Sequence, residues 1–160
     1  MTTYDHAHKR SMFLSPTHRN LLAAVVDRII PPGGGLPGAS EAGVAEHVEG
    51  IAGVSPQSRA LLTNELKAIE AKSGRTHSKA FAALSDGKKT EVLKQVESEH
   101  TEFFVALVRE AYSGYYSRAE VLRAKGLPLV APQPEGYKIE PFDAGLLEGV
   151  RTRGKAYRDA

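Results

Sequence analysis

Apolar residues recur at α-helical spacing along most of the first 113 positions of the chain. The clearest stretch follows Ser15 and Pro16 and contains a broad apolar stripe, made of Leu21, Leu22, Val25, Val26, Ile29 and Ile30. Serine caps the free amides of a helix start, and the fixed φ of proline suits the first turn. The pattern therefore predicts a helix that begins at Pro16 and buries this stripe.

This helix must end before Pro31 and Pro32, because proline lacks an N–H and disfavours the α conformation at the residue before it. Three glycines at 33–35 then allow the chain to reverse. Apolar residues return at helical spacing from Ala39 to Val48, and Ile51 extends that face. The segment predicts a helix, a sharp break and a second helix.

Three longer helices are expected downstream. The first starts at the Ser55–Pro56 cap, buries Leu61 with later apolar residues and stops at Gly74. After a short helical turn at 81–84, the next two run from Ser85 through Val96 and from about Thr101 to Ser113–Gly114. Because strand alternation is missing, the predicted fold class is all-α, with about five or six helices in one small domain.

The composition changes after Tyr116. Residues 118–125 could form one more short helix, whereas 126–142 contain four prolines and few helix formers, which predicts an extended, Pro-rich arm. The apolar residues of the arm need a surface to cover, either the core of this chain or a partner protein. We expect a flexible N-terminus at 1–14, a helical domain at 15–117, and a region at 118–160 with the short helix, the arm and a tail.

Charge and composition exclude several classes of function. The chain has 160 residues, and its 21 Lys and Arg are nearly balanced by 19 Asp and Glu without a block of like charge, which argues against a nucleic-acid partner. It has no cysteine, which rules out thiolate chemistry and disulfides. No stretch reaches the roughly 20 apolar residues of a membrane span, and the N-terminus does not read as a signal peptide. A cytoplasmic location is the default expectation, with periplasmic export alongside a partner as the alternative.

Motifs of catalysis and cofactor binding are not found in the sequence. The glycines at 33–35 follow a helix and lack the Lys-Ser/Thr of a phosphate-binding loop. Glu97 and His100 have metal-like spacing, but a ferritin-like di-iron site needs two such pairs and further carboxylates. We therefore expect no catalytic, cofactor-binding or metal-binding residue in this chain.

Aromatic residues gather at the end of the last long helix. Phe103 and Phe104 have the spacing of core residues, whereas Tyr115 and Tyr116 follow Gly114 and are expected outside regular helix, with at least one ring at a surface or interface. With the aromatic and proline residues of the arm, they form the predicted partner-binding set: Tyr115, Tyr116, Pro132, Pro134, Tyr137 and Phe142.

Three motifs carry a resemblance to a known family. IIPP at 29–32, PGASEAGVAEHVE at 37–49 and GYYS at 114–117 occur in the order seen in gluconate 2-dehydrogenase subunit 3 proteins, and the similarity spans about 15–137. The chain departs from many relatives in having Arg118, Ala119 and Glu120 after the aromatic turn, and in lacking a twin-arginine leader.

The resemblance implies a non-catalytic small subunit of a heteromeric, FAD-dependent sugar or polyol dehydrogenase of the glucose-methanol-choline type. Such a subunit supports the folding, flavin loading or stability of the catalytic flavoprotein. FAD is then expected in the large partner subunit, and a cytochrome c subunit is a further candidate partner. The alternatives are a stand-alone helical chaperone or binding module that acts transiently on a client, and, more remotely, a ferritin-like metalloprotein.

Overall fold

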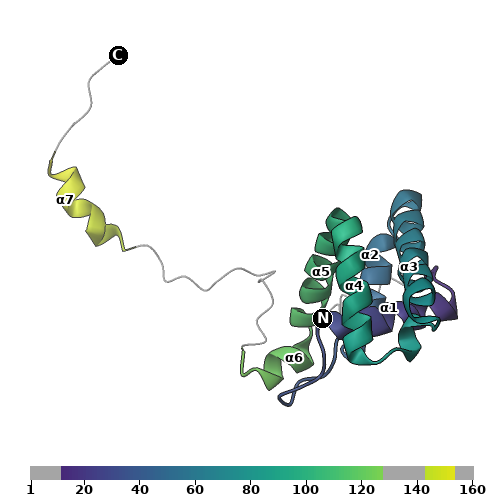
Figure 1. The fold of residues 1–160 in the computed structure, drawn as a ribbon. Coiled ribbons are helices and arrows are strands. Elements are labelled where there is room, and N and C mark those ends of the chain that lie inside the picture. Colours follow the sequence, from purple (N-terminus) through teal and green to yellow (C-terminus); the bar gives the residue numbers. More distant parts are fainter. Residues whose placement is uncertain (1–11, 128–142, 154–160) are drawn as a thin grey trace. The chain divides into compact units, whose positions relative to one another are not determined.

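The computed structural model describes residues 12–127 and 143–153, and the chain divides into two compact units, 1–129 and 130–160. Six α-helices, α1 to α6, lie in the first unit, and no strand occurs in the described parts of either unit (Figure 1). The predicted all-α fold is confirmed. None of the helices in these ranges is long and apolar enough to cross a membrane.

The first helix, α1 (Pro16–Ile29), begins and ends as predicted. The Oγ of Ser15 accepts a hydrogen bond from the amide of His18, and the helix stops ahead of the two prolines. The second helix, α2 (Val44–Ala52), starts later than the apolar pattern suggested. Turns occupy residues 39–43, because Gly43 adopts a left-handed φ of 72° that cannot belong to a right-handed helix.

The third helix, α3 (Pro56–His77), starts at its predicted cap but continues beyond Gly74. The predicted stop was wrong because a single glycine inside a helix costs only about 1 kcal/mol, which a long packed helix tolerates. The helix ends instead at His77, because the next residue, Ser78, has a φ of 54° that turns the backbone out of the helix.

The remaining helices of the first unit follow one another along the chain with short connections. A 3₁₀ turn, η1 (Phe81–Ala83), leads to α4 (Asp86–Glu99), which is followed directly by α5 (Thr101–Tyr116) and the short α6 (Ala119–Ala124). The last of these corresponds to the short helix expected at 118–125 and packs against α5. The second unit has η2 (Ala144–Leu147) and α7 (Glu148–Arg151), and most of the predicted arm, 128–142, lies outside the described residues.

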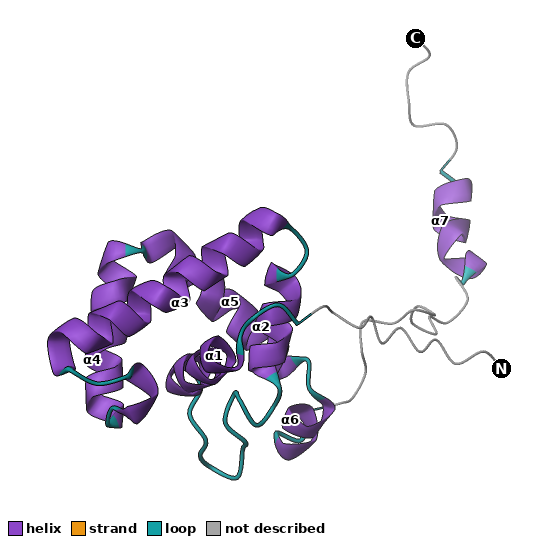
Figure 2. Ribbon diagram, turned by 90° about the vertical axis from the view of Figure 1, so that its right-hand side faces the viewer, coloured by secondary structure: helices purple, strands orange, loops and turns teal. Residues whose placement is uncertain are grey.

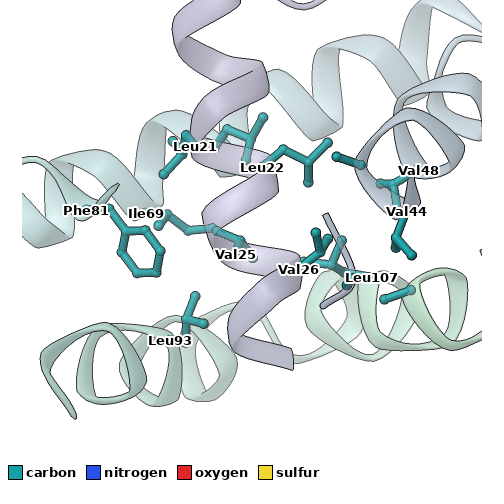
Figure 3. Packing of buried hydrophobic residues seen from close by; sticks show 14 of the residues in the cluster. Leu21, Leu22, Val25, Val26, Val44, Val48, Ile69, Phe81, Leu93 and Leu107 are labelled. Carbon is teal, nitrogen blue, oxygen red and sulfur yellow. The ribbon is translucent and has the colours of Figure 1, made fainter. Parts of the chain in front are cut away.

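The core is built around α1, which contacts each of the helices α2 to α5. Figure 3 shows Leu21, Leu22, Val25 and Val26 of α1 reaching side chains of its neighbours on both sides. Two residues predicted to face inward are exposed, since Leu61 on α3 has 53% and Ile51 on α2 has 39% of its surface accessible. The apolar faces of α2 and α3 are therefore wider than the area that the core covers. Other fully buried residues are Val44, Leu66, Ile69, Phe81, Val92 and Val96.

Candidate functional site

Residues 30–43 form the loop between α1 and α2, which extends away from the helices (Figure 2). This loop contains most of the IIPP motif and about half of the PGASEAGVAEHVE motif. Its tip is a tight reversal in which Gly33 and Leu36 exchange two backbone hydrogen bonds of 3.2 and 3.0 Å. Gly34 and Gly35 have φ of 60° and 79°, a region that disfavours other residues. The sequence therefore specifies a short, exposed hairpin rather than a mobile glycine run.

The base of this loop is held by Asp27 of α1. One oxygen of its carboxylate accepts a hydrogen bond of 2.8 Å from the amide of Ser40, and the other accepts one of 2.5 Å from the Ser40 hydroxyl. A Cβ on Gly38 would lie 2.9 Å from the same carboxylate, so the glycine makes room for the contact. The motif residues thus fix the return of the chain onto its own first helix.

Two residues at the end of α5 and the start of α6 also hold the loop. The Tyr115 hydroxyl donates a hydrogen bond of 2.7 Å to the carbonyl of Pro37, and Nη2 of Arg118 donates one of 2.6 Å to the carbonyl of Gly43. Tyr115 is only 2% exposed, and burial, with the nearby Tyr116, Glu120 and Glu41, raises the pKa of its phenol. The 30–43 loop and the end of α5 therefore form one connected structure.

The expectation that Tyr115 and Tyr116 lie outside the helix is wrong, because α5 continues through Gly114 to Tyr116. Within the helix the two neighbouring rings point in different directions, about 100° apart. Tyr115 enters the core, whereas Tyr116 is 41% exposed. The expectation that at least one ring reaches the surface is met by Tyr116.

Tyr116 forms an exposed aromatic pair with Tyr112, one turn earlier on α5. Their rings are stacked with centroids 6.0 Å apart, and the Nζ of Lys125 lies 5.6 Å from the Tyr116 centroid. Tyr112 is 44% exposed. We call these two residues the tyrosine pair; it offers apolar area, hydroxyl groups and a neighbouring cation, a combination common at protein interfaces.

An open hollow of about 330 Å³ adjoins the tyrosine pair. It lies between the end of α1, α4 and α5, and its lining includes Ile29, Phe104, Val108 and Tyr112. A neighbouring hollow shares Arg28 with it and reaches Pro31 and Pro32 of the 30–43 loop. The tyrosine pair therefore adjoins a surface that extends to the start of the 30–43 loop.

The other predicted partner-binding residues, Pro132, Pro134, Tyr137 and Phe142, lie outside the described residues, and their role stays a prediction. Sequence reasoning missed the role of Tyr112 as a partner of Tyr116. Its spacing of four residues from Tyr116 is the signal that could have revealed a stacked pair, once the helix was extended through Gly114.

The comparison with known families matches most of the first unit. A family model described as gluconate 2-dehydrogenase subunit 3 matches residues 16–127, from the first residue of α1 to just beyond α6. The chain belongs to the gluconate 2-dehydrogenase subunit 3 family. No curated protein and no solved structure matches it.

Glu97 and His100, the two residues with metal-like spacing, do not lie at one site in this subunit 3 protein. Nδ1 of His100 lies 2.9 Å from Oε2 of Glu65 on α3, whereas Glu97 lines the hollow beside the tyrosine pair. Within 12–127 and 143–153, no three His, Asp or Glu side chains are grouped to hold a metal ion. The His100–Glu65 contact links α3 to the start of α5.

Gly114 on α5 faces His47 on α2 at close range in this subunit 3 protein. A Cβ at this position would lie 2.7 Å from Cδ2 and 3.1 Å from Cβ of His47. We predict that Gly114→Ala lowers the free energy of unfolding by about 1–2 kcal/mol in spite of the better helix propensity of alanine. The control is Gly74→Ala in α3, where nothing lies within 4 Å and we expect a gain of up to about 1 kcal/mol. Urea denaturation measures both, and equal stabilisation of both variants would contradict the packing argument.

Proposed function

We propose that this chain is a non-catalytic accessory subunit of an FAD-dependent sugar or polyol dehydrogenase, and that it supports folding, flavin loading or stability of the large flavoprotein subunit. Membership of the family supports a place in a dehydrogenase complex. The observation that carries the proposal further is the exposed tyrosine pair, which lies beside a hollow whose neighbour reaches Pro31 and Pro32 at the start of the 30–43 loop.

Hydrogen bonds between distant segments hold the backbone beneath the tyrosine pair. Tyr115 and Arg118 tie α5 and the start of α6 to the 30–43 loop, so the tyrosine pair stands on ordered backbone. A surface that is already ordered loses little conformational entropy when a partner covers it. The arm predicted at 126–142 directly follows Lys125 in the sequence, and we propose that Pro132, Pro134, Tyr137 and Phe142 extend the same contact.

Co-expression of the full chain with the large flavoprotein subunit tests the proposal. Native mass spectrometry should detect a stable complex in which FAD is bound by the large subunit. The dehydrogenase activity or flavin content of the large subunit should fall when this chain is omitted. Flavin retained by this chain alone would contradict the proposed division of roles, and a contact seen only during maturation would favour the transient chaperone instead.

We predict that Tyr116→Ala weakens the complex at least ~30-fold, because truncation of an interfacial aromatic anchor commonly costs 2 kcal/mol or more. Tyr116→Phe keeps the ring and should retain most of the affinity. The isolated variant should melt close to the unmodified chain, since Tyr116 is 41% exposed. Affinity is measured by titration of the purified large subunit. Unchanged affinity together with a large fall in melting temperature would assign the ring to folding instead.

A further inference from the structure

A second hollow lies on the opposite flank of α5 from the tyrosine pair. Phe104, Val108 and Tyr112 share one flank of the helix, at steps of four residues. Phe103, Ala106 and Glu110 share another, which the 100° rotation per residue places nearly opposite to the first. The two surfaces can therefore be covered at the same time by different segments of a partner.

The second surface is a groove with an apolar end. Its walls come from α2, α3 and α5, and Ile51, Leu61, Phe103 and Ala106 line it above the buried Leu62 and Leu107. Leu61 is 53% exposed although it belongs to the apolar stripe of α3. Large apolar side chains gathered in a groove, rather than scattered singly, are typical of a docking site.

The other end of the same groove is acidic. A hollow of about 610 Å³ shares Leu61, Phe103 and Ala106 with the apolar end and is lined further by Glu65, Glu99, His100 and Glu102. Glu65 contacts His100, and Oε1 of Glu99 accepts a hydrogen bond of 2.6 Å from Lys72, which lowers the pKa of Glu99. The exposed Glu102 has no such hydrogen bond or ion pair among the described contacts. No lysine or arginine lines this end.

The spacing between the apolar end and the acidic end defines which helix can bind in the groove. On α3, the acidic Glu65 lies four residues after the apolar Leu61; on α5, the acidic Glu102 lies four residues before the apolar Ala106. Each interval is about one helical turn, roughly 6 Å along the axis. A bound helix matches both ends when it carries an apolar side chain and a lysine or arginine three or four residues apart.

We propose that this groove is a second docking site, and that it receives a helix of the large dehydrogenase subunit that has apolar and basic side chains one turn apart. The inference rests on the proposed function. A second copy of this chain is a poorer occupant. A two-fold contact would place the carboxylates against like carboxylates or against the apolar end, where the one lining cation, Arg109, is already paired with Glu110 at 3.0 Å.

The test compares two added charges on adjacent exposed positions of α3, in the full chain co-expressed with the large flavoprotein subunit. Leu61→Glu places a carboxylate in the apolar end and should weaken the complex at least ~10-fold. Ala60→Glu adds the same charge about 100° around the helix, outside the residues that line the groove, and should leave the affinity within about twofold. Melting temperatures of the isolated variants show whether either change disturbs folding.

A third variant, Glu102→Lys, reverses the charge at the acidic end. It should weaken the complex by about three- to tenfold at low salt, and this loss should shrink as salt screens the contact. A stable complex that Leu61→Glu and Glu102→Lys leave unchanged would overturn the second site alone. Absence of any complex with the unmodified chain would overturn both this inference and the proposed function. Self-association of the unmodified chain that Leu61→Glu abolishes would assign the groove to a second copy and overturn the proposal.

Discussion

Replacement of Glu49 by alanine is expected to lower the free energy of unfolding by about 2–4 kcal/mol, because its buried carboxylate serves three donors. Glu49 is fully buried on α2, and its Oε1 accepts hydrogen bonds of 2.7 Å from the amides of both Phe13 and Leu14. Its Oε2 pairs with Nε of Arg19 at 3.1 Å. Alanine would leave the amides of Phe13 and Leu14 and the Nε of Arg19 without their acceptor. The Arg19 side chain is 33% exposed, so water compensates part of its loss.

Urea denaturation with two companion variants resolves the contributions. Glu49→Gln keeps one acceptor oxygen for the amides but removes the charge, so its stability should fall between those of the unmodified chain and Glu49→Ala. Glu46→Ala removes an exposed carboxylate from the same helix and should cost less than about 1 kcal/mol. Equal losses for Glu46→Ala and Glu49→Ala would show that the buried contacts contribute little.

Tyr115→Ala is expected to cost about 3–5 kcal/mol, since it removes a fully buried ring and its hydrogen bond to Pro37 together. Tyr115→Phe keeps the ring and should cost about 1 kcal/mol, the usual net worth of one hydrogen bond. The gap between the two variants measures the packing of the ring. If Tyr115→Phe proves as damaging as Tyr115→Ala, the hydrogen bond to the 30–43 loop, rather than the ring, dominates.

The raised pKa of Tyr115 adds a signature in pH. The folded protein keeps the phenol protonated at a pH at which the unfolded chain has begun to ionise, so unfolding releases a proton. The contribution of this group is complete below the unfolded pKa of about 10 and is lost as pH rises through the higher folded value. Tyr115→Phe should therefore lose less stability than the unmodified chain as pH rises above about 10. A constant difference in stability between the two proteins across this rise would contradict the prediction.

The sequence was a good guide where a serine cap or a proline sets a helix boundary. Ser15 with Pro16 and Ser55 with Pro56 start helices in the predicted places, because capping acts within one turn. Pro31 and Pro32 end α1 for an equally local reason. These signals were enough to predict the all-α fold.

Contacts between distant residues could not be predicted in this way. Gly114 looks like a helix end, yet its role is to make room for His47, which is 67 positions away in the chain. The hydrogen bond from Tyr115 to Pro37 joins residues 78 positions apart, and no local pattern distinguishes it from a surface tyrosine. The exposure of Tyr116 was predicted from the sequence, whereas its stacking on Tyr112 depends on a helix that continues through Gly114.

The central position of α1 has a consequence for synthesis on the ribosome. This helix precedes α2 to α5 in the chain, yet these later helices cover its apolar stripe, and Tyr115 and Arg118 hold the loop after it. The stripe is therefore not completely covered until α5 and Arg118 have left the exit tunnel. Nascent chains with exposed apolar surface are prone to aggregate. Codon changes that slow translation between α1 and α5 should thus reduce the soluble yield, whereas slowing after α6 should not.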